Sequence, residues 1–214
     1  MIRSCRPERC PLCERPGLEV SFVIADHRYY RCRSCDLIQM SPLPDLGVAD
    51  DYTGFDLDRY RRFVDAFLVP QYRRALKLIR ENRRSGRLLD IGCGTGEFLD
   101  QAKAAGFEVT GLEPSATAGR VAGERHNVIH GKFEEAPLPA RAYDVVTFWS
   151  VLEHVPRPLA FLEKVRAVAK PDSVVAFRVP AVDGVLPAAA HFLYRISLGA
   201  IDRPLRIIYQ LDWH

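Results

Sequence analysis

The feature that most constrains this chain is a glycine-rich turn near its middle, Gly92-Cys93-Gly94-Thr95-Gly96. The turn follows a short apolar run at 88–91 and opens onto a helical pattern, so we expect a strand, a tight turn and a helix in succession. Glycine reaches positive φ without strain and lets a ligand approach the backbone closely. Because such a turn also presents unpaired N–H groups at a helix N-terminus, it predicts a ligand site.

The spacing within the turn separates three ligand classes. A dinucleotide fingerprint needs a third glycine where Glu97 stands, and a phosphate-binding P-loop needs a lysine directly after Gly96. What remains is G-x-G-x-G with an acidic residue, Asp90, two positions before it. A second acid, Glu113, ends the next apolar run, near the spacing at which an acidic residue meets ribose hydroxyls. Its carboxylate can accept hydrogen bonds from both hydroxyls.

In the rest of the second half, apolar residues are spaced in turn as in a strand and as in a helix. Helical patterns separate short apolar runs, which we expect to be strands at 88–91, 107–112, 128–130, 145–149 and 174–179. This alternation predicts an α/β fold with a parallel sheet covered by helices on both faces.

The segment 142–155, Ala-Tyr-Asp-Val-Val-Thr-Phe-Trp-Ser-Val-Leu-Glu-His-Val, resembles the fourth-strand region of the class I, Rossmann-like S-adenosylmethionine-dependent methyltransferases. Together with the glycine turn, this likeness covers residues 87–180 in the family's order. It implies a doubly wound, mainly parallel sheet and S-adenosylmethionine as the cofactor. The cofactor-binding residues implied are Asp90, Gly92, Cys93, Gly94, Gly96, Glu113, Lys132, Phe133, Trp149 and Ser150.

The resemblance also assigns roles within this set. The turn would hold the methionine part of the cofactor, oriented by Asp90, and Glu113 would bind the ribose. Lys132 and Phe133 fall where the family contacts adenine, although the family often has aspartate at position 132. Trp149 and Ser150 would line the pocket near the methyl donor.

Two further residues of this region invite a catalytic interpretation. Cys93 lies inside the glycine turn, where we expect a small packing residue and not a nucleophile. His154 follows the fourth strand at the edge where ligands bind in open parallel sheets. An imidazole there could deprotonate an acceptor hydroxyl or carbon acid. A histidine bonded to nearby backbone at a helix start is an equally good interpretation.

The N-terminal part carries a different signal, C-x2-C-x18-C-x2-C, formed by Cys10, Cys13, Cys32 and Cys35. Each C-x-x-C turn brings two thiolates together, and two such turns complete a tetrahedron around zinc. Four protein ligands predict a closed, structural site on a small zinc-ribbon module. Buried or redox-active thiols are the alternative, and Cys5 outside the pattern is expected to be a free thiol.

We therefore expect a zinc-ribbon module at 1–44, a helical linker at 45–86 and a methyltransferase domain at 87–214. After the fifth strand, the sequence shows no second strand that could complete an antiparallel hairpin at the edge of the sheet. We therefore expect the sheet to be incomplete or the domain to be C-terminally truncated. The stretch 184–201 is apolar enough to lie on a membrane surface, but a helix packed on the sheet is the commoner explanation. With no secretory or membrane-spanning run and six cysteines, the expected location is cytoplasmic.

Charge bears on the substrate. The net charge is only +3, far from that of a dedicated nucleic-acid binder. Residues 59–87 are locally basic, which suits either a pyrophosphate or an RNA backbone, or only a solvated helix face. Zinc knuckles before this domain resemble both sugar methyltransferases and ribosomal-RNA methyltransferases. We favour a small molecule or glycan precursor such as a nucleotide-linked sugar; an rRNA substrate and an inactive cofactor-binding scaffold are the alternatives.

Overall fold

The computed structural model describes residues 7–24, 27–41, 62, 64–180 and 184–208, except for the side chains of Asp65 and Ile207. The expectations for Cys5, for residues 45–61 and 63 of the linker and for the end of the chain after residue 208 lie outside these residues. Two compact units emerge from the chain's contacts. The first, here the cysteine unit, comprises Met1–Leu46, Pro156–Leu159 and Pro180–His214; the second, the sheet unit, comprises Gly47–Val155 and Ala160–Val179.

The sheet unit is built on five parallel strands: β4 (Gly86–Ile91), β5 (Phe107–Glu113), β6 (Asn127–His130), β7 (Tyr143–Trp149) and β8 (Ala169–Arg178). Their order is β6-β5-β4-β7-β8, and every neighbouring pair is parallel. The chain first builds outward from β4 to β6 and then reverses to β7, which places a topological switch point between β4 and β7. The predicted α/β fold with a mainly parallel sheet is confirmed.

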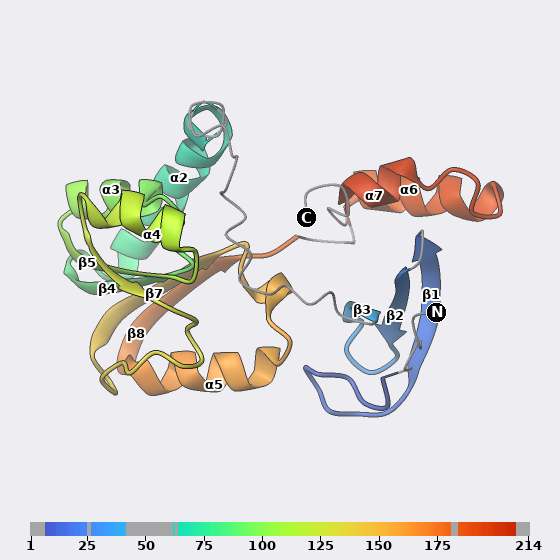
Figure 1. Ribbon diagram of the computed structural model, residues 1–214, viewed down its shortest axis with the longest axis horizontal. Helices are drawn as coiled ribbons and strands as arrows, with labels where there is room; N and C mark the ends of the chain where they lie inside the picture. The colour runs from blue at the N-terminus through green and yellow to red at the C-terminus, as the bar shows by residue number, and fades with distance from the viewer. Residues whose placement is uncertain (1–6, 25–26, 42–61, 63, 181–183, 209–214) are drawn as a thin grey trace. The chain divides into compact units, whose positions relative to one another are not determined.

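Helices cover both faces of this sheet (Figure 1). One face carries α2 (Val69–Asn82), α3 (Glu97–Ala104) and α4 (Ala116–Gly123); the other carries α5 (Pro158–Val168). Alternate residues of β4 supply the two cores, since Leu88 packs on the α2 and α3 side while Leu89 and Ile91 pack on the α5 side.

Local signals explain where these helices begin and end. Pro70 occupies the first turn of α2, a position that suits proline, and α2 directly follows a short π-helix at Val64–Leu68. Ser115 caps α4 by accepting a hydrogen bond from the Ala118 N–H at 3.2 Å. Gly106, with φ of +97°, follows the end of α3 as a left-handed C-terminal residue.

The cysteine unit contains a three-stranded antiparallel sheet of β1 (Leu18–Ile24), β2 (His27–Cys32) and β3 (Ile38–Ser41). β1 and β2 form a hairpin between the two C-x-x-C turns, and β3 follows the second turn. Two helices from the end of the chain, α6 (Val185–Ile196) and α7 (Arg203–Ile208), belong to the same unit.

Packing and hydrogen bonds join α6 and α7 to the antiparallel sheet. Ala190 and Leu205 are buried in one cluster with Phe22 and Ile24 of β1. The Tyr194 hydroxyl donates to the Val23 carbonyl at 2.7 Å and accepts from the Val23 N–H at 3.2 Å. The apolar stretch at 184–201 thus supplies a helix that packs on a sheet, and within the described residues that sheet is the antiparallel one. Across the same residues, no helix is long and apolar enough to cross a membrane.

Candidate functional site

The glycine turn lies at the carboxyl end of β4, as predicted. Gly92, Gly94 and Gly96 all have positive φ, of +71°, +54° and +91°. A Cβ atom added to Gly92 would lie 2.5 Å from Cγ2 of Val151, which follows β7. The turn therefore needs glycine both for its backbone conformation and for its close approach to the segment after β7.

Glu113 connects this turn to the next helix. The Gly94 N–H donates to Oε2 of Glu113 at 2.8 Å, and the Ser115 N–H donates to Oε1 at 2.9 Å. Burial raises the pKa of the Glu113 carboxyl above its usual value, and the two backbone donors oppose this shift. Each carboxylate oxygen keeps a further lone pair, so Glu113 can still accept hydrogen bonds from a ligand.

Asp90 lies beneath the turn and is almost wholly buried, with 1% of its surface exposed. Its Oδ1 accepts a hydrogen bond from the Thr147 hydroxyl at 2.7 Å, whereas Oδ2 has no hydrogen-bond partner among the described residues. Burial raises the pKa of Asp90 to about 8, with the charge of Glu113 adding to the shift and the Thr147 hydrogen bond opposing it. A buried acceptor of this kind suits a donor on a ligand, such as an ammonium group.

Trp149 ends the fourth strand of the sheet, β7, and Ser150 directly follows it at the same edge. The Trp149 ring packs 4.8 Å from the ring of Phe98 on α3 and 5.6 Å from that of Tyr72 on α2. Its Nε1 is buried and has no hydrogen-bond partner among the residues that the structure describes. Ser150 has a φ of +55°, an uncommon value for a residue with a side chain and one that turns the chain sharply away from β7.

The two residues expected near adenine differ in exposure. Lys132 is exposed after β6. Phe133 is buried, and its ring lies 4.9 Å from that of Phe161 on α5, in the core of that face. The phenyl ring of Phe133 therefore packs in the protein core, and an adenine contact by either residue stays a prediction.

Cys93 occupies the position of a packing residue. It is buried, and a Cβ added to Gly111 of β5 would lie 2.6 Å from its Sγ. Burial, together with the negative charges of Asp90 and Glu113, raises the pKa of the Cys93 thiol well above its usual range. Such a thiol is a poor nucleophile. Gly111, which sequence reasoning did not single out, is needed because it makes room for Cys93.

His154 ends a short 3₁₀ turn, Leu152–His154, directly after β7, and its side chain is exposed. Its backbone N–H donates to the Val151 carbonyl at 2.9 Å. The neighbouring Glu153 has a pKa raised above its usual value by burial, opposed in part by Arg178 and by a hydrogen bond from Ser150. The structure places His154 at the expected edge of the sheet, and its catalytic role stays a prediction.

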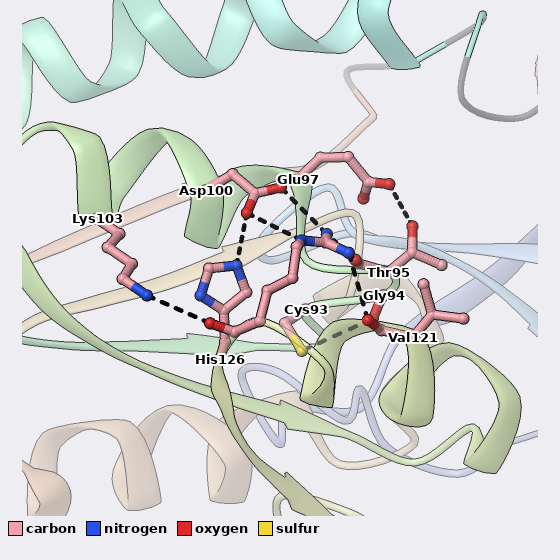
Figure 2. A network of polar contacts seen from close by, with 9 residues as sticks. Cys93, Gly94, Thr95, Glu97, Asp100, Lys103, Val121 and His126 are labelled. Carbon is pink, nitrogen blue, oxygen red and sulfur yellow. Dashed lines mark hydrogen bonds and ion pairs between the residues drawn. The ribbon is translucent and has the colours of Figure 1, made fainter.

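A polar network that the sequence did not reveal joins the turn to α3 and to the residues after α4 (Figure 2). Asp100 of α3 accepts from Arg125 Nε at 3.2 Å and lies 2.7 Å from His126 Nε2. Arg125 also donates to the Thr95 carbonyl at 2.8 Å. Burial would raise the pKa of Asp100, but the hydrogen bonds from Arg125 and His126 hold it below its usual value. The network fixes the turn and α3 to the end of α4.

In the cysteine unit, the four cysteines of the double C-x-x-C pattern come together. Their Sγ atoms all lie within 4.8 Å of one another, with Cys10 to Cys35 and Cys13 to Cys32 both at 3.6 Å. These separations are far longer than a disulfide bond. Four thiolates at the tetrahedral Zn–S distance of ~2.3 Å would be about 3.8 Å apart, so the cluster fits zinc.

The two cysteine turns have the same backbone design. The Cys10 carbonyl accepts from the Glu14 N–H at 2.9 Å, and the Cys32 carbonyl accepts from the Asp36 N–H at 3.0 Å. Glu14 and Asp36 also share the left-handed conformation, with φ of +57° and +60°. The repeated geometry presents two thiols from each turn to one point, as a zinc knuckle requires.

Several known proteins resemble large parts of this chain. The model of a family described as a methyltransferase domain matches residues 52–206, more than half of the chain. The ubiquinone biosynthesis O-methyltransferase of Paraburkholderia xenovorans is 38% identical over 99 residues, a match that covers 42% of each chain. The enzyme of the same name from Actinobacillus pleuropneumoniae is 34% identical over 103 residues, covering 42% of this chain and 44% of the relative. The matches thus span less than half the length of these curated relatives.

A solved structure extends the likeness in fold. A SAM-dependent methyltransferase from Thermotoga maritima superposes with a TM-score of 0.52, covering 75% of this chain and 78% of that one. At 20% sequence identity, this likeness concerns the arrangement of strands and helices alone.

Proposed function

The chain belongs to the methyltransferase-domain family, and from this premise we propose that it transfers a methyl group from S-adenosylmethionine to a small-molecule acceptor. The observation that carries the proposal is the position of Glu113, whose carboxylate joins the glycine turn to the start of α4 at the carboxyl edge of the sheet. There, beside the switch point between β4 and β7, open parallel sheets bind their ligands.

In this proposal each polar group of the turn has a partner on the cofactor. Glu113 accepts hydrogen bonds from the ribose hydroxyls, and the unpartnered Oδ2 of Asp90 accepts from the ammonium of the methionine part. Lys132 and Phe133 lie beside the adenine. Trp149 and Ser150 line the pocket between the cofactor and the acceptor.

The bound cofactor supplies an activated methyl group on a sulfonium, so its departure needs no acid. The protein's main contribution is to align the acceptor with the methyl group and to exclude water. His154, at the end of the 3₁₀ turn after β7, takes the proton from the acceptor where the acceptor needs a base.

The acceptor class rests on two arguments. The matched relatives are named for O-methylation in ubiquinone biosynthesis, which favours a small molecule. The net charge of +3 disfavours the rRNA alternative. A nucleotide-linked sugar, expected from the N-terminal cysteines, is the finer proposal within the small-molecule class.

Zinc is the second cofactor that we propose, held by Cys10, Cys13, Cys32 and Cys35 in the cysteine unit. With four protein ligands it stabilises the fold and leaves no open position for a substrate. Free thiols in such a cluster suit a reducing compartment, which supports a cytoplasmic location.

Calorimetric titration of the zinc-loaded protein with S-adenosylmethionine tests the first proposal. We expect about one equivalent to bind, and we expect Gly94→Val to abolish binding because a β-branched side chain cannot adopt the φ of +54° at this position. Radiolabelled methyl transfer to catechols, nucleotide-linked sugars and rRNA fragments then identifies the acceptor. A folded protein that binds no S-adenosylmethionine would overturn the proposal, and one that binds it but methylates nothing would favour the scaffold alternative.

A further inference from the structure

Arg178, the last residue of β8, lies at the carboxyl edge of the sheet with both terminal nitrogens bonded to neutral groups. Its Nη1 donates to Gln71 Oε1 of α2 at 3.0 Å, and its Nη2 donates to the Ser150 hydroxyl at 2.7 Å. These partners come from two different elements, so the guanidinium plane is held in one orientation. Of its five N–H donors, three remain for another ligand.

Within the described part of the chain, Arg178 forms no direct ion pair. Among the described residues no carboxylate oxygen lies within 4.0 Å of its guanidinium, in contrast to Arg83, which follows α2 and pairs with Asp172 of β8. Arg83 lies 2.5 Å from the Asp172 carboxylate and 3.8 Å from that of Asp144. The carboxyl of Glu153 is linked to Arg178 indirectly, through the Ser150 hydroxyl that bonds to both side chains.

Two contacts link this guanidinium to the proposed methyl-donor site. Ser150, which accepts from Arg178, directly precedes Val151, and Val151 is the residue that approaches Gly92 of the turn. Trp149, on the other side of Ser150, packs on Phe98 in the first turn of α3. Arg178 is therefore linked to the cofactor turn through Ser150 and Val151, from the β8 side of β7.

We propose that Arg178 binds an anionic group, a carboxylate or a phosphate, on the methyl acceptor, with Ser150 and Gln71 positioning its guanidinium. The inference rests on the proposed methyltransferase function and narrows its substrate class to anionic small molecules. A fixed, planar fork of N–H donors matches both anions, because each presents two oxygens at the spacing of the guanidinium nitrogens.

The test uses the full-length, zinc-loaded protein saturated with S-adenosylhomocysteine. Benzoate and inorganic pyrophosphate serve as carboxylate and phosphate probes, and benzyl alcohol serves as the neutral probe. Affinities are measured by calorimetry for the wild type, Arg178→Gln and Arg178→Lys. Lys77→Gln, which removes the same charge from an exposed position on α2, is the matched control.

One of the two anions should bind the wild type more tightly than benzyl alcohol does. Arg178→Gln should weaken that anion about tenfold or more, as expected for lost hydrogen bonds between charged groups. Arg178→Lys should recover only part of the loss, because lysine keeps the charge but not the fork. The affinity of Lys77→Gln should stay within about twofold of the wild type, and S-adenosylhomocysteine should bind all four proteins alike.

The same anion affinity in Arg178→Gln as in the wild type would overturn the inference and leave Arg178 as a structural link between α2 and β7. Binding of neither anion by the loaded protein would also overturn it. Failure of S-adenosylhomocysteine to bind is a separate result, which removes the proposed function itself. Should Arg178→Gln not fold, the NMR signal of Arg178 Nε–H in the wild type should move on addition of the bound anion, and an unmoved signal would count against the inference.

Discussion

The two units of this protein are stabilised in different ways. The sheet unit has a hydrophobic core on each face of its parallel sheet, each with thirteen buried residues. Among its described residues, the cysteine unit has two small clusters, one of five buried residues and one of four, and two of those four are the cysteines Cys10 and Cys32. A core of that size rarely supports a fold without a metal or cross-link. We therefore expect the sheet unit to fold without a ligand, whereas we expect the cysteine unit to depend on the zinc that we propose for it.

Removal of zinc should have the largest effect and should separate the two units. Structural zinc contributes on the order of 10–16 kcal/mol to small zinc modules, so a strong chelator should unfold β1 to β3. The sheet unit should keep its structure and its affinity for S-adenosylmethionine within a few fold. Hydrogen exchange followed by mass spectrometry measures both units in one experiment.

Metal analysis supplies the stoichiometry for this prediction, about one zinc per chain. Cys10→Ser should lose the metal, whereas Cys93→Ser in the sheet unit should retain it. Backbone amides at 18–32 that remain protected after chelation, or a disulfide within the cluster, would contradict the comparison.

His154→Ala should affect chemistry without affecting the stability of the sheet unit. The side chain is exposed, so its removal leaves the cores intact. If His154 is the base, kcat should fall by about 10²–10⁴-fold with cofactor affinity nearly unchanged. Steady-state kinetics with the identified acceptor check this, and turnover within a few fold of the wild type would make His154 a structural residue.

Glu113→Ala should weaken S-adenosylmethionine by about 1.5–3 kcal/mol, the loss expected for hydrogen bonds to a charged group. Glu113→Gln should also weaken binding, because its NH₂ replaces one of the two carboxylate oxygens and cannot accept the backbone N–H bond made there. Glu108→Ala, an exposed acid on the same strand, is the control. Unchanged calorimetric affinity in both Glu113 variants would show that the cofactor binds elsewhere.

Tyr194→Phe should have the smallest effect and should be confined to the cysteine unit. The variant loses the hydroxyl that bonds both the N–H and the carbonyl of Val23, at a cost of about 0.5–1.5 kcal/mol. Phe192→Ala on the exposed side of the same helix should change stability by less than about 0.5 kcal/mol. Denaturant unfolding of the zinc-loaded protein should resolve the two, and equal stabilities would mean that α6 adds little to this unit.

The sequence by itself determined the features that depend on short stretches of chain. The cysteine spacing predicted the cluster because a C-x-x-C turn brings its two thiols together locally. Alternating periods predicted all five parallel strands, although β8 begins at Ala169 and not at 174. The glycine turn was identified because positions of positive φ favour glycine. Glu113 was identified because it is an acidic residue at the end of an apolar run.

Only the tertiary structure decided which distant groups meet. Arg178 and Gln71 are 107 residues apart, and Tyr194 and Val23 are 171 apart. The sequence favoured a helix packed on the sheet for the stretch 184–201, but it did not predict that this helix packs on β1. A hydrophobic pattern predicts which face of a helix or strand is buried, but not which element packs against that face. Partner choice depends on strand order and on the complementary shapes of side chains from distant parts of the chain, because neither is encoded in any local stretch of residues.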